Sequence, residues 1–259
     1  MHQPDSNPIA TSCQRRNGLA VKAGSWWCLG VLLLAISPAR SAAGGVTDLP
    51  GDLWDDVRHL PTRENAWWLA GGAATALLVS TFEDPEAVAR TLNQPVIDEL
   101  ADFGNVWGDA RVQAPLALAT WGLGAWAGSE EAAGLGYDLT RSLALTYGAV
   151  SALKVTFNRE RPNGEDYSFP SGHTASAFST AGVVSRRYGG WAGGVAIGLG
   201  VLTGLGRMED LKHYGSDVVA GATIGWIIGR NAGRPRGDAD GLGLQLVPLG
   251  RGLAVAGRF

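Results

Sequence analysis

The stretch PSGHTASAFSTAG, residues 170–182, places a histidine directly before a run of small residues that are compatible with a helix. Ser171 is a residue type that caps helix N-termini, so we expect a helix to begin at Gly172. The free N–H groups at such a helix start favour an anion. A helix that served packing alone would not need His173 in its first turn. The stretch therefore predicts a closely packed helix that begins at a polar site.

The composition around this stretch favours a membrane protein or a tightly packed helical bundle. Hydrophobic residues make up 46% of the 259 residues and charged residues only 17%, with 38 glycines. Soluble domains are nearer to 25% charged. The formal net charge is -3, without the basic excess of a nucleic-acid-binding protein. We therefore expect no nucleic acid partner.

Six apolar segments predict an all-α fold with a six-helix core bundle and the site at one end. An amphipathic stretch, Leu53–Leu60, precedes them, and glycine and alanine recur within them, which lets helix backbones approach closely. The six segments are Ala66–Thr81, Val112–Gly128, Leu139–Phe157, Gly172–Arg187, Trp191–Gly206 and Gly215–Gly229.

Two interpretations of these helices stay open. Each apolar run is at or below the roughly 17–25 residues that a membrane span needs. Arg141 and Lys154 also interrupt the third segment. The chain is then either an integral membrane protein with short helices or a compact bundle in the periplasm.

The two ends of the chain differ from this core. Residues 1–43 resemble a signal peptide or N-terminal anchor, with Arg15, Arg16 and Lys22 before the apolar run WWCLGVLLLAI and small residues near Ala43. Both cysteines lie in this leader. Residues 44–65 form an amphipathic lead-in, residues 66–232 the helical domain and residues 233–259 a linker and tail. Alternating leucines from Leu242 onward predict a short C-terminal β-hairpin.

Two further polar motifs flank the opening stretch, each at the end of an apolar segment. K-VTFNRE-RP occupies residues 154–162, and GR-MEDLK-H-YGS-D occupies residues 206–217. Lys154, Arg161 and Arg207 are three cations that an antiparallel bundle brings to one end. Buried cations are costly without partners, and a shared tetrahedral anion such as phosphate would compensate them.

His213 and Asp217 are four residues apart, a spacing that places a carboxylate against one imidazole nitrogen. The carboxylate would fix the tautomer and leave the other nitrogen free to attack. His173 is then available to protonate a leaving oxygen. Singly, these residues are typical of caps, ion pairs and helix-end cations, but together they predict a phosphoryl-transfer site. We expect His213 to lie in an exposed cleft.

The three motifs resemble those of the type 2 phosphatidic acid phosphatase and vanadium haloperoxidase superfamily. The family pattern is Lys-x6-Arg-Pro, Pro-Ser-Gly-His and Ser-Arg-x5-His-x3-Asp, and this chain departs from it at Gly206, where the family has serine. The resemblance covers about residues 66–230. It implies a metal-independent phosphatase without cofactor, in which His213 becomes phosphohistidine, Asp217 orients it and His173 protonates the leaving group. Lys154, Arg161 and Arg207 would hold the phosphoryl oxygens, with help from Ser171 and Gly172.

The resemblance favours an enzyme of the bacterial envelope that hydrolyses lipid phosphomonoesters or isoprenyl pyrophosphates, membrane-associated and with its site facing the periplasm. A soluble periplasmic acid phosphatase of broad specificity is the main alternative. Two further hypotheses are a vanadate-dependent haloperoxidase and a catalytically inactive scaffold protein. We expect substrate specificity to lie in an acidic loop, Phe82–Arg111, on the side of the motifs.

Overall fold

The structure, a computed structural model, describes residues 44–234 and two strands near the C-terminus. The predictions for the leader, for both cysteines and for the linker after residue 234 lie outside the described residues. The elements in chain order are α2 (Leu49–Arg58), α3 (Arg63–Ser80), α4 (Pro85–Leu92), α5 (Pro95–Trp107), α6 (Ala110–Trp126), α7 (Glu130–Phe157), α8 (Gly172–Tyr188), α9 (Gly190–Glu209), α10 (Gly215–Ala232), β1 (Gln245–Leu249) and β2 (Gly252–Ala256).

The all-α fold is confirmed, and each of the six expected segments is a helix. They correspond to α3, α6, α7, α8, α9 and α10, and the amphipathic stretch before them is α2. Side-chain caps begin several of these helices, as at Thr62 for α3 and Ser129 for α7. The α7 helix starts nine residues earlier than expected, because Ser129 caps it and two glutamates occupy its first turn.

The prediction of a loop at Phe82–Arg111 is wrong, because most of this segment is the helices α4 and α5. Each helix begins with proline, which suits the first helical position because its missing N–H would have no partner there. Asp84 caps α4 by accepting a hydrogen bond from the Ala87 N–H. The α5 helix then packs against α9 and closes the end of the bundle that carries the motifs.

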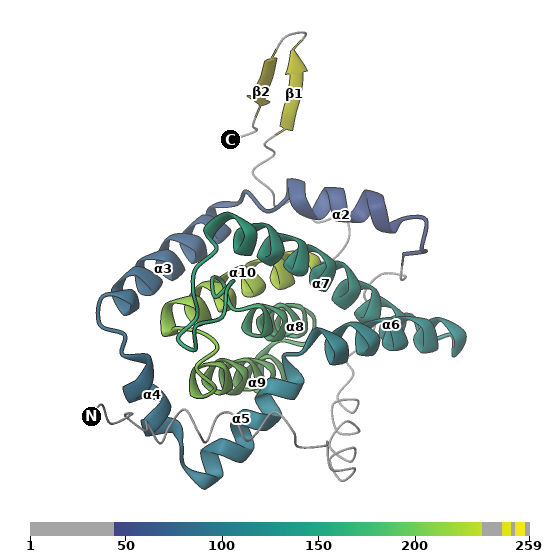
Figure 1. Cartoon of the computed structure of the whole chain (residues 1–259). Coiled ribbons are helices and arrows are strands. Elements are labelled where there is room, and N and C mark those ends of the chain that lie inside the picture. The colour runs from purple at the N-terminus through teal and green to yellow at the C-terminus, as the bar shows by residue number, and fades with distance from the viewer. Residues whose placement is uncertain (1–43, 235–244, 250–251, 257–259) are drawn as a thin grey trace, which may run out of the picture. The chain divides into compact units, whose positions relative to one another are not determined.

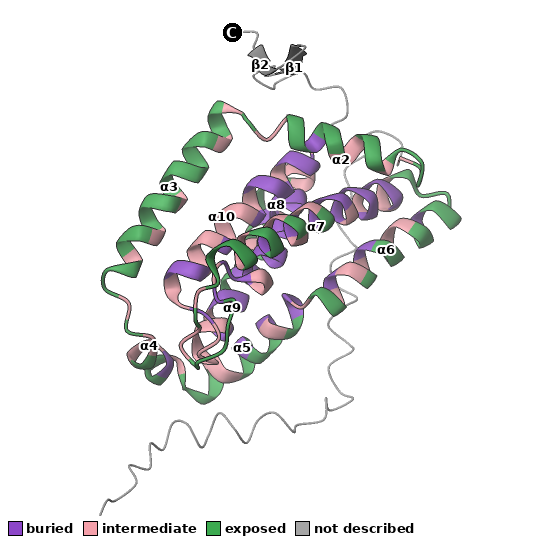
Figure 2. Cartoon of the chain, turned by 45° about the horizontal axis from the view of Figure 1, so that its top comes forward, coloured by how far each residue is buried: buried purple, intermediate pink, exposed green. Residues whose placement is uncertain are grey.

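The α8 helix lies at the centre of the bundle. It packs against α7, α9 and α10, which surround it in Figure 1. Ten of its 17 residues are buried, and most of these are Ala, Ser, Thr, Gly or Val. Figure 2 shows the contrast with α3, which is exposed along most of its length and has no buried residue. The small residues after PSGH are therefore there because neighbouring helices approach α8 from several sides.

The contact between α8 and α10 is a contact of backbones. Gly221, Gly225 and Gly229 recur every fourth residue along α10, and each faces a carbonyl oxygen of α8. A Cβ atom at Gly225 would lie 2.0 Å from the Ala175 oxygen, and one at Gly221 would lie 2.4 Å from the Ser171 oxygen. Real Cβ atoms do not approach oxygens so closely, so the glycines set the spacing of these helices.

A buried ionic cluster holds α2 and α7 together at the end of α10. The Arg141 guanidinium donates to Asp56 at 2.8 Å, to Asp138 at 2.9 Å and to the Ala232 carbonyl at 2.8 Å. Arg187 of α8 also pairs with Asp138 at 2.5 Å. Burial raises the pKa of Asp56 to about 6, although Arg141 opposes that shift. The charges are mutually satisfied, so removing one would leave the others uncompensated.

Among the described helices, none combines the length and the apolar character that a membrane crossing requires. Large apolar side chains are nonetheless exposed on several of them. They include Trp67, Trp68, Leu77, Leu78, Phe103, Val106, Leu118, Leu123 and Trp126.

The predicted C-terminal hairpin is present. Strands β1 and β2 pair antiparallel, with Gln245 opposite Ala256 and Leu249 opposite Gly252.

We predict that Gly225→Ala destabilises the protein while Gly194→Ala does not. A methyl group at Gly225 would collide with the backbone of α8, and such overpacking typically costs about 1–3 kcal/mol. Gly194 of α9 is exposed with open space around its Cβ position, so alanine there should stabilise the helix by roughly 0.5–1 kcal/mol. Chemical denaturation measures both, and equal effects would contradict the proposed backbone contact.

We also predict that Arg141→Met lowers the free energy of unfolding by about 3–5 kcal/mol, because it leaves the buried Asp56 without its ion-pair partner and Asp138 with Arg187 alone. The matched control is Arg90→Met, which breaks an exposed pair with Glu86 and should change stability by less than about 1 kcal/mol. Urea unfolding of both variants is the measurement, and a loss below 1 kcal/mol at Arg141 would show that the cluster is dispensable.

Candidate active site

The first motif places two cations at the end of α7. Lys154 lies in the last turn of this helix, and its Nζ donates to the backbone carbonyl of Tyr167. The helix ends at Asn158, whose left-handed backbone conformation turns the chain into the loop that carries Arg161. Arg161 donates to Glu165 at 2.8 Å, which holds the guanidinium on that loop. The first cation thus lies in the last turn of α7 and the second on the connection that leads to α8.

The second motif begins α8 as predicted. Ser171 is the N-cap, and its Oγ accepts a hydrogen bond from the Thr174 N–H at 3.4 Å. Its own N–H donates to the backbone carbonyl of Asp217 at 3.0 Å, which joins the second motif to the third. Gly172 and His173 form the first turn of α8. The His173 ring is 32% exposed, and its Nε2 lies 3.9 Å from Asp109.

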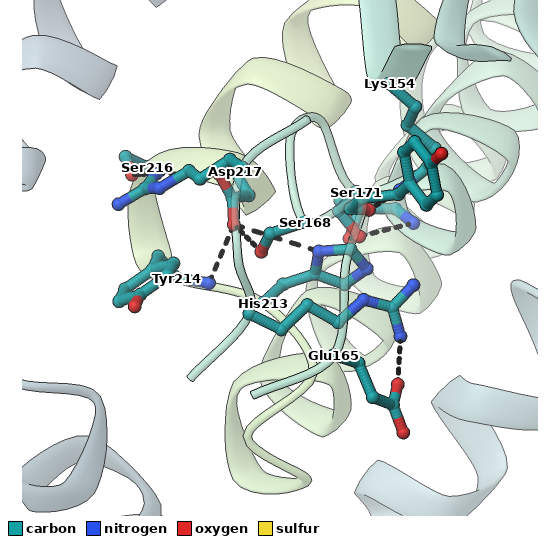
Figure 3. Close-up of polar contacts among 12 residues, drawn as sticks. Lys154, Glu165, Ser168, Ser171, His213, Tyr214, Ser216 and Asp217 are labelled. Carbon is teal, nitrogen blue, oxygen red and sulfur yellow. Dashed lines mark hydrogen bonds and ion pairs between the residues drawn. The ribbon is translucent and has the colours of Figure 1, made fainter. Parts of the chain in front are cut away.

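The third motif runs from the last turn of α9 into the first turn of α10. Arg207 donates to Asn105 at 3.2 Å, and its guanidinium lies 3.6 Å from Asp210. The His213 Nδ1 lies 3.8 Å from the Asp217 Oδ2, as predicted from their spacing, and Figure 3 shows the two side chains facing each other. This is an ion-pair distance; catalytic hydrogen bonds are often long without substrate and tighten on binding.

His213 does not lie in an exposed cleft, contrary to the expectation. Its side chain is only 2% exposed, and Figure 3 shows Asp217 and Ser168 beside its ring. A cavity of about 400 Å³ adjoins it between the end of α3, α4 and the start of α10. The cavity walls are mainly apolar, but Glu83 and Asp84 also line the cavity. The apolar lining includes Leu78, Val79, Phe82, Val88, Met208 and Gly215.

The pKa values show that the three cations lie within electrostatic range of one another. Burial, together with the charges of Arg161 and Arg207, lowers the pKa of Lys154 to about 8. Burial also lowers the pKa of Arg207, with a contribution from Arg161. The structure therefore brings Lys154, Arg161 and Arg207 together as the sequence predicts.

The two imidazoles of the motifs are neutral at pH 7. Burial lowers the pKa of both His213 and His173 to about 4, and the positive charge of Arg207 acts in the same direction on each. Asp217 opposes this shift at His213. Although burial alone would raise the pKa of Asp217, its hydrogen bonds and the nearby Arg159 lower it, so this residue is a carboxylate.

Several polar partners of the motifs were missed from the sequence. Arg159 and Ser168 both bind the Asp217 carboxylate, at 2.8 and 2.5 Å. Both lie within or just after the first motif, so their position was a usable signal. Glu83, Asn105 and Asp109 reach the site from segments around α4 and α5. No local pattern marks these three, because tertiary packing alone brings them to the motifs.

Comparison with known proteins agrees with these motifs. Residues 136–232 match the model of the PAP2 superfamily, and this range contains all three motifs. Over these residues the chain is therefore similar to the PAP2 superfamily.

Two curated relatives are similar to part of the chain. The lipid A 1-phosphatase of Porphyromonas gingivalis is 38% identical over 91 residues, which are 34% of this chain and 20% of that protein. The lipid A 4'-phosphatase of Helicobacter pylori is 32% identical over 105 residues, 36% of this chain and 52% of that protein. The alignments thus span about a fifth and about half of these relatives.

Two crystal structures also resemble the chain. LpxE of Aquifex aeolicus has a TM-score of 0.47 at 25% identity, covering 56% of this chain and 89% of that one. A PAP2-type phosphatidylglycerolphosphate phosphatase from Bacillus subtilis has a TM-score of 0.48 at 17% identity, covering 72% and 92%.

We predict that the His173 and His213 imidazoles titrate near pH 4 in the protein alone and at higher pH when inorganic phosphate is added. The negative charge of phosphate would offset Arg207 and Lys154, which now disfavour the imidazolium forms. NMR titration of the imidazole resonances measures both values. Titrations that do not respond to saturating phosphate would contradict an anion site beside these rings.

The lowered pKa values of His173 and His213 also determine how the stability of the fold changes with pH. Because both histidines are less basic in the folded chain than the usual 6.5, their contribution to stability is fully present above pH 6.5 and is lost as the pH falls toward 4.

Proposed function

We propose that this chain is a phosphatase that hydrolyses phosphorylated lipids through a phosphohistidine formed on His213. The observation that carries the proposal is the convergence of three cations on the buried pair of His213 and Asp217. The Nε atoms of Arg161 and Arg207 are buried and have no acceptor among the residues that the structure describes. Phosphoryl oxygens would supply those acceptors and balance the positive charge.

The first half of the reaction would transfer the phosphoryl group to the enzyme. With Asp217 beside its Nδ1, His213 would attack phosphorus through Nε2 as the bond to the leaving oxygen breaks. Lys154, Arg161 and Arg207 would stabilise the charge on the phosphoryl oxygens. His173 would give its proton to the leaving oxygen. Bound phosphate would favour the protonated form of His173, because its negative charge opposes the positive charge of Arg207, which lowers the pKa of His173.

The second half would release phosphate. His173, having lost its proton to the leaving group, would accept one from water as that water attacks the phosphohistidine. The bond between phosphorus and His213 would break, and the neutral imidazole would return to its pair with Asp217. Asp109 lies 3.9 Å from the His173 ring on the side of α6, where its charge favours the protonated form of that imidazole.

Three observations support a lipid as the substrate. The cavity beside His213 has mainly apolar walls, so it suits an alkyl chain better than a polar head group. Large apolar side chains are exposed on α3, α5 and α6, an arrangement that favours contact with lipid. The curated relatives are named as phosphatases of lipid A. Together with the leader predicted from the sequence, these features support an enzyme of the bacterial envelope, and we propose that its site faces the periplasm.

We predict that His213→Gln lowers the turnover number by more than about a thousandfold, because glutamine cannot form the covalent intermediate. His59→Gln, at an exposed histidine of the lead-in, is the matched control and should retain full activity. The measurement is phosphate release in detergent, with chelator present, from lipid phosphomonoesters, lipid pyrophosphates and water-soluble phosphate esters. Circular dichroism checks that each variant is folded.

The substrate panel separates the alternatives. Release from lipids that requires His213 would support the proposal, whereas release mainly from soluble esters would point to a broad acid phosphatase. Activity that is lost in chelator and restored by a divalent ion would contradict metal independence. No release at all, with halide oxidation when vanadate is added, would point to a haloperoxidase.

A further inference from the structure

The Asp217 carboxylate is held by more than its pairing with His213. It is fully buried and receives hydrogen bonds from Ser168 Oγ at 2.5 Å, from the Tyr214 N–H at 3.0 Å and from Arg159 at 2.8 Å. Of these donors, Arg159 brings a full positive charge. The negative charge that Asp217 presents to His213 therefore depends on how strongly this guanidinium binds Asp217.

Arg159 is itself held from its other side. One terminal nitrogen donates to Asp217, and the other donates to Glu83 at 2.7 Å. The guanidinium also lies 3.9 Å from the centroid of the Tyr214 ring, which restricts its tilt. A guanidinium has a rigid fork of donors, so it can bridge two carboxylates in one fixed orientation. Arg159 thus shares its charge between Glu83 and Asp217.

Glu83 is well placed to fix that bridge. Its side chain is only 10% exposed. It accepts hydrogen bonds from the Ser216 N–H and Oγ, both at 3.0 Å, in the first turn of α10 that also carries Asp217. Glu83 lies between α3 and α4, outside the range that matches the PAP2 superfamily. The bridge therefore joins this segment to the motifs.

We propose that Glu83 is a positioning residue for the reaction, which acts through Arg159 to keep the charge and orientation of Asp217 suited to His213. This inference rests on the proposed phosphatase function. Glu83 also lines the cavity beside His213, but the role proposed for it passes through Arg159, which binds both Glu83 and Asp217.

The charges around His213 determine in which direction the loss of the Glu83 charge should shift the pKa of His213. Lys154 of α7, His173 of α8 and Arg207 of α9 face the imidazole as cations or potential cations, and Asp217 of α10 opposes them. If Glu83 loses its charge, the positive charge of Arg159 is no longer shared with Glu83 and acts on Asp217 alone. Asp217 would then stabilise the His213 imidazolium less, and His213 would become less basic and a weaker nucleophile.

The test compares Glu83→Gln with Glu64→Gln, a control in which an exposed glutamate loses its pair with Arg230. We expect Glu83→Gln to lower the turnover number about tenfold, a barrier increase of about 1.4 kcal/mol, with KM changed by less than about twofold. The acid limb of kcat/KM and the NMR titration of His213 should both move to lower pH. The control should match the wild type in all four quantities.

Two further variants test the route through Arg159. In an Arg159→Met background, Glu83→Gln should have no added effect on turnover, because the element that couples Glu83 to Asp217 is gone. Glu83→Asp keeps the charge on a shorter side chain, so its acid limb should lie between those of the wild type and Glu83→Gln. An additive effect in the double variant would overturn the route.

A purely structural role gives a different result. If Glu83→Gln lowers the melting temperature but leaves turnover, the acid limb and the His213 titration unchanged, the inference is wrong. If Glu83→Gln does not fold, Glu83→Asp decides through the same readouts, since a shorter carboxylate should weaken the bridge and shift them in part. If the wild type hydrolyses nothing, the proposed function fails, and the His213 titration still decides whether Glu83 is coupled to it.

Discussion

The close contact between the backbones of α8 and α10 is the constraint on which the rest of the structure depends. Glycines at every fourth position of α10 meet the carbonyl oxygens of Ser171, Ala175 and Ser179. The same contact continues into the site, where the Ser171 N–H binds the Asp217 carbonyl. Two motifs that are separate in sequence thereby form one surface. A larger side chain on either helix would push apart the start of α8 and the residues that surround His213.

Charged groups lie at both ends of the contact between α8 and α10, but the two groups of charges are paired in different ways. Around Arg141, each cation has a carboxylate and each carboxylate a cation, so the charges are paired within the protein, although the Arg141 Nε has no acceptor among the described residues. Around His213, the half-buried Lys154 donates to a backbone carbonyl instead of a carboxylate, and Arg207 lies 3.6 Å from Asp210. Burial lowers the pKa of both cations. The first arrangement holds helices together. The second leaves positive charge for an anion, which is what the proposed phosphoryl-transfer site needs.

The candidate site was predictable where chemistry follows local spacing. The four-residue step from His213 to Asp217, the cap at Ser171 and the cations at helix ends could each be identified from sequence, and the structure brings them together. The bridge of Glu83 and Arg159 could not, because Glu83 is more than 130 residues from Ser216, which it binds. Likewise, the burial of His213 was not predicted, since local sequence does not report which segments cover a side chain.

By itself, the sequence determined the all-α class, the six principal helices and the order of the three motifs. It could do so because apolar periodicity, caps and glycine placement act over a few residues. Only the tertiary structure decided that residues 82–111 fold as two helices beside the site, and that the cavity next to His213 is mainly apolar. It also decided that one arginine binds both Asp217 and Glu83. These features depend on contacts between distant segments, and such contacts arise only when the helices pack.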